Sequence, residues 1–172
     1  GFSSLQDGNS FNVVVSAEMD PAARKTLRLR AYYRALKKNN PGALDEYYRF
    51  CETPGLIEPK LNKSKEQWIE ADEEARQICL GSLEGNEELD AIIKNKLVSN
   101  TPWVLIGGPP CQAYSIVGRA RNRGKLDYKA EDDHRHFLYK EYLRIIQKNR
   151  PAVFVMENVK GILSSKVGGE SI

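Results

Sequence analysis

Three short apolar runs divide the chain and predict buried β-strands. They lie at residues 11–17, 101–106 and 152–156, and each is rich in β-branched or large apolar side chains. Short runs that are largely apolar are typical of strands that are covered on both faces. The first run is followed by Asp20-Pro21, where the proline biases the residue before it away from helical geometry and indicates a turn.

Helical patterns separate these runs. Residues 22–38 are good helix formers that stop at Asn39-Asn40-Pro41-Gly42, and residues 84–97 and 133–149 each carry apolar side chains at helical spacing. Apolar strands that alternate with helices predict an α/β fold, in which a mostly parallel sheet is flanked by helices. Breaks such as Thr53-Pro54-Gly55 interrupt the pattern, and we expect a mostly helical insertion at about residues 40–80.

Each predicted strand leads into an unusual polar cluster. These clusters are Glu18-Met19, Pro110-Cys111-Gln112 and Glu157-Asn158. In parallel sheets, ligands and chemistry gather beyond the carboxyl ends of the strands. The sequence therefore predicts a functional site at this edge of the sheet.

Cys111 is the strongest candidate nucleophile in this region. It follows a strand and the turn Gly107-Gly108-Pro109-Pro110, which places the thiol at the mouth of the sheet. Glu157, at the end of the next strand, is placed to manage a proton beside it. An inert core cysteine is the alternative. His134 and His136 lie in a charged segment at a helix start, which disfavours a Cys-His hydrolase.

Composition narrows the class of protein. The 172 residues are 41% hydrophobic and 28% charged, which is typical of a globular domain. No apolar stretch approaches the roughly 20 residues that span a bilayer, so we expect no membrane partner. Neither a secretion signal nor a disulfide framework is indicated, and Cys51, Cys79 and Cys111 lack zinc-binding spacing. These features predict a cytoplasmic protein without a metal.

The net charge of +3 is small, but the charges are unevenly distributed. Residues 24–38 contain seven basic residues and no acid, residues 113–130 form a second basic block, and residues 45–90 are strongly acidic. We expect the basic residues of the first block to form a solvated helix face. The second block, in a segment beyond a strand end, is the better candidate for contacts with nucleic acid.

Two motifs in this order resemble the C5-cytosine DNA methyltransferases. They are Gly107–Ser115, reading GGPPCQAYS, and Phe154–Val159, reading FVMENV. Residues 1–5, 16–20 and 133–139 are similar to further elements of that family. The resemblance implies a Rossmann-like S-adenosylmethionine-dependent methyltransferase fold. It also implies that residues 1–172 are a partial catalytic domain, incomplete at both ends and without the target-recognition region.

The resemblance further implies a covalent mechanism. Cys111 matches the nucleophile that adds to C6 of cytosine, and Glu157 matches the carboxyl group that contacts N3 of the base, which is flipped out of the duplex. Residues matching the S-adenosylmethionine site are Phe2, Glu18, Met19, Pro109 and Leu138. Residues matching the DNA and cytosine contacts are Pro110, Gln112, Ser115, Arg119, Arg121 and Asn158. One departure is Gly81-Ser82-Leu83, where the family usually has Gly-Asp-Ile.

The expected activity is therefore methylation of double-stranded DNA, and the motif Gln112–Ser115 resembles the bacterial enzymes of restriction-modification systems. A cognate restriction endonuclease is the partner that such a system implies. Two alternatives stay open at this point. One is a transfer RNA cytosine-5 methyltransferase, and the other is a non-catalytic homologue that binds nucleic acid.

Overall fold

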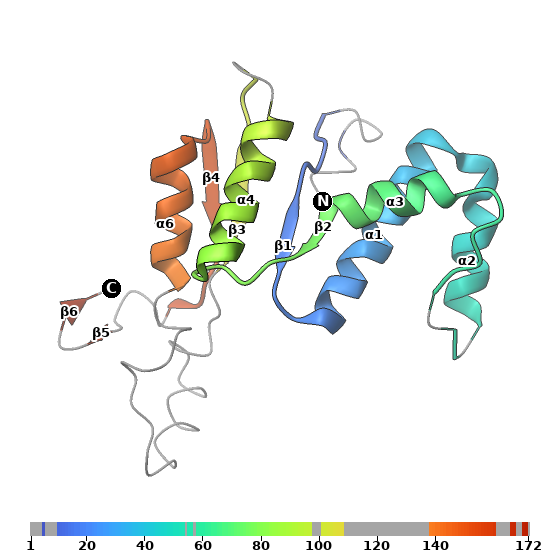
Figure 1. Ribbon diagram of the computed structural model, residues 1–172, viewed down its shortest axis with the longest axis horizontal. Coiled ribbons are helices and arrows are strands. Elements are labelled where there is room, and N and C mark those ends of the chain that lie inside the picture. Colours follow the sequence, from blue (N-terminus) through green and yellow to red (C-terminus); the bar gives the residue numbers. More distant parts are fainter. Residues whose placement is uncertain are drawn as a thin grey trace, which may run out of the picture. The chain divides into compact units, whose positions relative to one another are not determined.

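The computed structural model forms two compact units, Gly1–Lys96 and Leu97–Ile172. Each unit contains a pair of short parallel strands with at least one helix in the connection between them (Figure 1). The chain is thus of the mixed α/β type. The structure describes residues 5, 10–53, 55–56, 58–97, 101–108, 138–160, 166–167 and 170–171.

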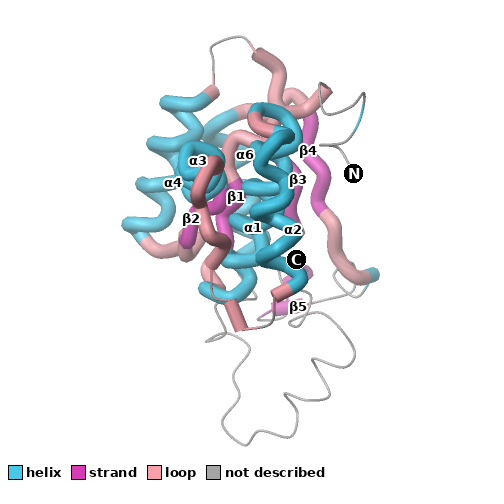
Figure 2. The backbone as a smooth tube through the Cα atoms, turned by 90° about the vertical axis from the view of Figure 1, so that its right-hand side faces the viewer, coloured by secondary structure: helices cyan, strands magenta, loops and turns pink. Residues whose placement is uncertain are grey.

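The first unit is organised around strands β1 (Ser16–Glu18) and β2 (Ala75–Gln77). They lie side by side in parallel, with Glu18 opposite Gln77 (Figures 1 and 2). The run at residues 11–17 thus contains a strand, but β1 begins only at Ser16. Strand β2 was not predicted, because Ala75-Arg76-Gln77 has no β-branched residue and follows a helix directly.

Helix α1 (Pro21–Asn39) confirms the helix predicted at residues 22–38. The Asp20 carboxylate accepts a hydrogen bond of 2.7 Å from the backbone N–H of Ala23, and Pro21 occupies the first turn, where its missing N–H costs nothing. The helix ends as the backbone N–H of Asn40 donates to the carbonyl of Leu36. Both ends are therefore fixed by local sequence.

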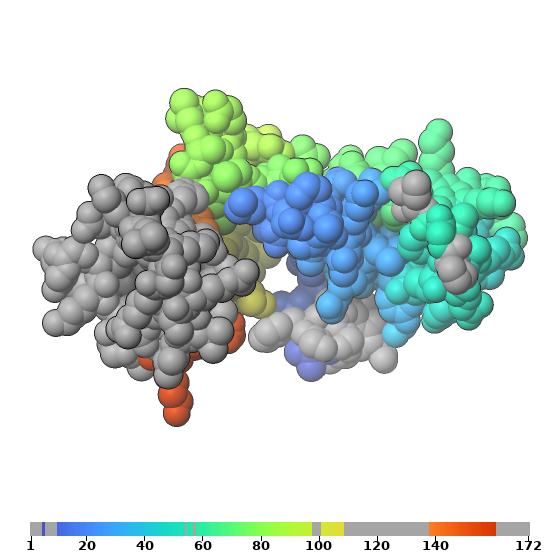
Figure 3. Space-filling model, turned by 90° about the horizontal axis from the view of Figure 1, so that it is seen from below, coloured from blue at the N-terminus to red at the C-terminus, as the bar shows by residue number. Residues whose placement is uncertain are grey.

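Three further helical segments connect α1 to β2. They are the short 3-10 turn η2 (Pro41–Ala43), α2 (Leu44–Glu52) and α3 (Lys65–Glu74). In the space-filling view, the blue residues of α1 lie beside the teal and green residues of this connection (Figure 3). The core between them consists mostly of small or aromatic side chains. It contains Ala31, Tyr32, Leu36, Ala43 and Ala71, with Tyr47 and Trp68 packed against it.

A buried polar network fixes the start of α3. The carboxylate of Glu46, which is only 5% exposed, accepts hydrogen bonds from the backbone N–H groups of Asn62 and Lys63, at 3.1 and 2.9 Å. It also accepts one from the hydroxyl of Ser64, which in turn contacts the Tyr32 hydroxyl at 2.6 Å. One buried acid thus ties α2 to the segment that leads into α3.

Helix α4 (Leu83–Lys96) closes the first unit and confirms the helix predicted at residues 84–97. Its buried side chains include Leu89 and Ile93, which are four residues apart and so lie on one face. The Arg76 guanidinium on β2 donates twice to Glu88 of this helix, at 3.0 and 2.7 Å. An ion pair therefore joins β2 to α4.

The second unit pairs β3 (Val104–Gly107) with β4 (Val153–Met156) in parallel, and α6 (Leu138–Asn149) lies in the connection between them. Both strands and the described part of the helix fall where they were predicted. A short antiparallel pair, β5 (Lys166–Val167) and β6 (Glu170–Ser171), follows.

The prediction that all these strands are buried is wrong: Ile106 in β3 is 52% exposed, the other residues of β1 and β3 are half-buried, and β4 departs furthest from the prediction. Each of its four residues is exposed, with Val153 and Phe154 more than half accessible. Phe154 contacts the ring of Tyr142 on α6, with ring centroids 6.4 Å apart. An apolar run indicates burial only where a second layer covers each face of the strand, and the described part of this unit does not cover β4 in that way.

Candidate active site

The carboxyl ends of β3 and β4 meet at Gly108 and Glu157. The backbone N–H of Glu157 donates to the carbonyl of Gly107 at 3.0 Å, which continues the pairing one residue beyond β4. A Cβ atom on Gly108 would lie 2.5 Å from the carbonyl oxygen of Glu157 and 3.4 Å from its carboxylate oxygen Oε2. The two segments approach this closely because Gly108 has no side chain.

Tyr142 supports this edge from α6. Its hydroxyl donates to the carbonyl of Val155 at 2.8 Å and contacts that of Leu105 at 3.3 Å, so that one side chain contacts both strands. A Cβ atom on Gly107 would lie 3.2 Å from the Tyr142 ring. Burial raises the pKa of the Tyr142 hydroxyl, which therefore stays protonated as a donor. The glycine pair thus leaves room for this ring as well as for Glu157.

Glu157 is exposed, so its carboxylate faces solvent at this edge. Asn158 follows, half-buried, and its Oδ1 accepts a hydrogen bond of 2.9 Å from the backbone N–H of Val159. Leu138 is half-buried at the first position of α6. The other predicted site residues of this unit lie outside the described residues. They are Pro109, Pro110, Cys111, Gln112, Ser115, Arg119 and Arg121.

In the first unit, Glu18 is half-buried at the carboxyl end of β1. Its Oε1 accepts a hydrogen bond of 2.9 Å from the backbone N–H of Asp20, which steadies the turn into α1. Among the described residues, no partner is present for its other carboxylate oxygen. Met19 beside it is 57% exposed. Phe2, the remaining predicted site residue of this unit, lies outside the described residues.

Ser82, which stands where the resembled family has an acid, is engaged by the local backbone. Its hydroxyl donates to the carbonyl of Cys79 at 2.9 Å and accepts from the backbone N–H of Gly85 at 3.0 Å. These contacts satisfy the first turn of α4. Ser82 therefore acts as a helix cap in this structure, a role that serine fills readily.

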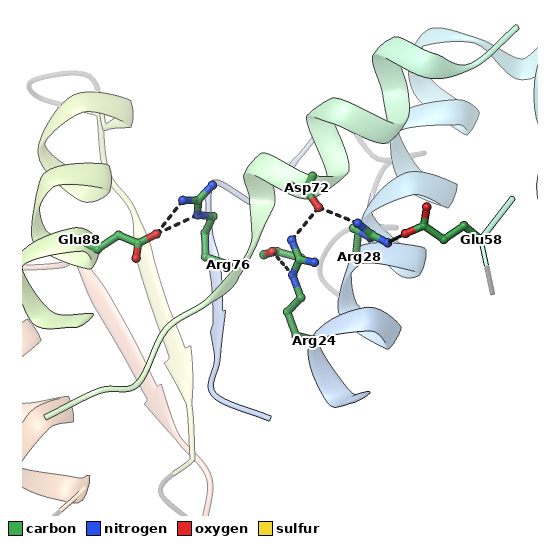
Figure 4. Close-up of polar contacts among 7 residues, drawn as sticks. Arg24, Arg28, Glu58, Asp72, Arg76 and Glu88 are labelled. Carbon is green, nitrogen blue, oxygen red and sulfur yellow. Dashed lines mark hydrogen bonds and ion pairs between the residues drawn. The ribbon is translucent and has the colours of Figure 1, made fainter. Parts of the chain in front are cut away.

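The expectation that the basic residues of α1 form a solvated face is wrong for three of them. Arg24 and Arg28 both donate to Asp72 Oδ1 of α3, at 2.6 and 2.8 Å, and Arg28 also reaches Glu58 at 2.6 Å (Figure 4). Arg34 pairs with Glu74. The acidic segment that follows α1 in the sequence provides these partners. Part of the basic block therefore forms ion pairs within the unit.

Sequence reasoning missed the hydroxyl of Tyr142 and these ion pairs. Tyr142 lies in the helix predicted at residues 133–149, where the apolar spacing says nothing about a hydroxyl contact. The sequence carries no local signal for this contact, because the Tyr142 ring meets Gly107 only in the folded unit. For the arginines, the signal was the succession of a basic helix and an acidic one, whose opposite charges attract in a compact unit.

Within the described ranges, no group of three or more histidine, cysteine, aspartate or glutamate residues is arranged to hold a metal ion. In the same ranges, every helix is too short or too polar to cross a membrane.

The family model and the similar proteins all indicate DNA methyltransferases. The family model of the C-5 cytosine-specific DNA methylases matches residues 70–171. The type II methyltransferase M.Bpa9945I of Bacillus paralicheniformis is 31% identical over 185 residues, which cover 98% of this chain and 41% of the relative. The putative type II methyltransferase M.MjaORF1200P of Methanocaldococcus jannaschii is 41% identical over 75 residues, which cover 44% of this chain and 19% of the relative. No solved structure matches significantly. The chain thus spans less than half the length of these curated relatives.

Proposed function

The chain belongs to the C-5 cytosine-specific DNA methylase family, and from that premise we propose that the protein transfers a methyl group from S-adenosylmethionine to C5 of cytosine in double-stranded DNA. The observation that carries this proposal is the close approach of Gly108 and Glu157. Gly108 lies three residues before Cys111 in the sequence, so Glu157 lies at the start of the segment that contains the proposed nucleophile.

Cys111 and Glu157 have complementary roles in this proposal. The Cys111 thiolate adds to C6 of the ring, and Glu157 supports the addition by contact with N3, where electron density builds up. C5 then carries the electron pair that would attack the methyl carbon of S-adenosylmethionine, and the bond from that carbon to sulfur would break to leave S-adenosylhomocysteine. Loss of the C5 proton to a base restores the double bond between C5 and C6, the bond from C6 to sulfur breaks, and the Cys111 thiolate is regenerated. The exposed carboxylate of Glu157 is accessible to a base that has been flipped out of the duplex.

S-adenosylmethionine supplies the methyl group when bound, and the residues present fit it in part. The carboxylate oxygen of Glu18 that has no partner in the described structure can accept hydrogen bonds from ribose hydroxyls, as an acid at a strand end does in nucleotide-binding sheets. Met19 is exposed next to it and can pack on the adenine. We assign Phe2, Pro109 and Leu138 to the same cofactor on the family resemblance.

Contacts with DNA phosphates are assigned to the segment that follows Cys111, and contacts with the cytosine to residues beside Cys111 and Glu157. Ser115, Arg119 and Arg121 are proposed to bind phosphates, and Pro110, Gln112 and Asn158 the cytosine and its surroundings. Arginine side chains suit this role because the guanidinium group binds phosphate oxygens in pairs.

The proposal extends to the arrangement of the sheet and to the biological system in which the protein acts. The two parallel strand pairs, each with a helical crossover, support a Rossmann-like sheet within a partial catalytic domain in which about residues 40–80 are a helical insertion. The names of the type II relatives favour a bacterial restriction-modification system, in which a cognate endonuclease cuts the same site and both act in the cytoplasm.

Covalent trapping tests the function directly. Duplex DNA containing 5-fluorocytosine is incubated with S-adenosylmethionine and the full-length parent protein of this proposed partial domain, because fluorine cannot leave C5 as a proton does. We expect an adduct that survives denaturation with the native protein and no adduct with Cys111→Ser, whereas Cys51→Ser serves as the matched control and leaves trapping unchanged. An adduct on RNA alone would move the assignment to the RNA enzymes. No adduct on either substrate, from protein that is folded, would favour the non-catalytic alternative.

A further inference from the structure

A cavity of about 690 Å³ lies in the first unit, away from Glu18. Its walls come from residues 11–14, from the second half of α1 and from α3, with Tyr47 of α2 and Lys96 of α4 completing them. Residues 11–14 precede β1, whereas Glu18 ends it. The cavity is therefore at the amino end of β1, and the proposed cofactor contact is at the carboxyl end.

The walls of the cavity carry an excess of positive charge. Five basic and three acidic side chains line it. Every one of the acids already has a polar partner: the pairs are Asn39–Glu70, Lys96–Glu73 and Arg34–Glu74. Arg30, Lys37 and Lys38 line the same cavity, are exposed, and have no acidic partner in the part of the chain that the structure describes. Three cations thus remain available to an anion.

These cations share one side of α1. Arg30 and Lys37 are seven residues apart, which is close to two helical turns, so they project in nearly the same direction, and Arg34 lies between them. The Arg34 guanidinium is held by Glu74, whose pKa is raised by burial although Arg34 opposes the shift. An incoming anion would therefore meet Arg30 and the two lysines rather than Arg34.

Two aromatic rings line the cavity next to the cations. Tyr33 and Tyr47 are half-buried, with ring centroids 5.0 Å apart and planes tilted by 47°. A tyrosine face accepts a planar ring by stacking, and this contact does not depend on which base is present. Acidic peptides would satisfy the cations but offer nothing planar to these rings.

From this combination we propose that the cavity bordered by Arg30, Tyr33, Lys37, Lys38 and Tyr47 binds a nucleotide unit. The phosphate contacts the three cations, and the base packs on the tyrosines. The unit comes from a free mononucleotide or from single-stranded nucleic acid, which share this chemistry. The site is separate from Cys111 and Glu157 in sequence and needs neither for binding.

Binding of thymidine 5′-monophosphate to the 172-residue chain, measured by calorimetry, tests the proposal. A pyrimidine nucleotide is chosen because the proposed cofactor site at Glu18 takes an adenosine. We expect saturable binding that weakens at least tenfold in the double variant Arg30→Gln/Lys37→Gln, since two charge-assisted contacts are lost. Lys25→Gln, an exposed cation on the same helix outside the cavity, is the control and leaves affinity unchanged.

Further ligands and variants distinguish a free mononucleotide from single-stranded nucleic acid, and both from an acidic peptide. Tyr33→Leu should weaken the nucleotide several-fold but leave inorganic phosphate unaffected, because phosphate has no ring to stack. If a short single-stranded oligonucleotide binds with the same dependence on Arg30 and Lys37 and the mononucleotide does not, the unit comes from nucleic acid. The proposal is overturned if neither binds, if Lys25→Gln weakens binding as much as the double variant, or if a polyglutamate peptide binds equally well.

Discussion

Replacing Gly108 by alanine is predicted to lower the rate of methyl transfer strongly while leaving most of the fold in place. A Cβ atom at this position would lie 2.5 Å from the carbonyl oxygen of Glu157, whereas ordinary contact begins at 3.4 Å. The obstacle is backbone and not the end of a flexible side chain. One of the two segments must therefore move by about 0.9 Å.

That displacement falls on the residues proposed to carry the chemistry. It acts on Glu157 directly and on the segment that leads from Gly108 to Cys111. A shift of about 1 Å in a reacting group can cost roughly 100-fold in rate. We therefore expect methyl transfer and 5-fluorocytosine trapping to fall by about that factor in Gly108→Ala.

The assay compares the initial rates of methyl transfer to duplex DNA by the full-length parent protein and its variants. Thermal unfolding of the same proteins is measured alongside. Gly42→Ala is the matched control, because nothing lies within 4 Å of a Cβ atom at that position, and we expect it to keep the native rate. If Gly108→Ala retained a rate within twofold of native, the close approach would have no part in positioning Glu157, and the reasoning would be refuted.

Three further predictions concern stability, measured by urea unfolding of the chain. Glu46→Ala should lower the free energy of unfolding by roughly 3 kcal/mol, because three donors lose a largely buried carboxylate. Asp72→Asn should cost about 1 kcal/mol at neutral pH. Burial alone would raise the pKa of Asp72, but the hydrogen bonds from Arg28 and Arg24 hold it below the ordinary value, so the advantage of Asp72 should vanish as the pH falls through that lowered pKa. Tyr142→Phe should cost about 1 kcal/mol, since the hydroxyl contacts two strands.

Each stability prediction has a control variant or a result that would contradict it. Glu66→Ala, an exposed acid at the start of α3, should be nearly neutral, and an equal loss in both glutamate variants would show that burial of Glu46 is irrelevant. A difference between native protein and Asp72→Asn that grows on acidification would contradict the ion-pair account. For Tyr142, an unchanged free energy of unfolding in the phenylalanine variant would mean that water replaces both contacts.

The sequence predicted the helices of this chain well, because their signals are local. Asp20 and Pro21 start α1, and Asn40 and Pro41 follow its end, each through contacts within a few residues. The strand ends that carry Glu18 and Glu157 were predictable for the same reason. Apolar runs that stop at polar residues mark where a strand ends.

Features that depend on distant contacts could not be predicted in this way. Strand β2 forms because Ala75-Arg76-Gln77 meets β1, more than fifty residues away in sequence, and not because of its own composition. The exposure of β4 depends on what covers it. The partners of Arg24 and Arg28 likewise become visible only when α3 packs against α1.

The anchoring of α3 by Glu46 has a practical consequence for engineering. Both ends of the segment between α2 and α3 are fixed, one by α2 itself and the other by the bonds from Glu46 to residues 62–64. Gly55 within this segment is exposed, has open space around it, and adopts a φ of +84° that suits glycine. Lengthening a loop between fixed ends costs only about 0.6 kcal/mol for each doubling. The position of Gly55 is therefore suited to the insertion of a peptide tag or a fluorescent label that would report on this unit while leaving its core and the proposed nucleotide cavity unaltered.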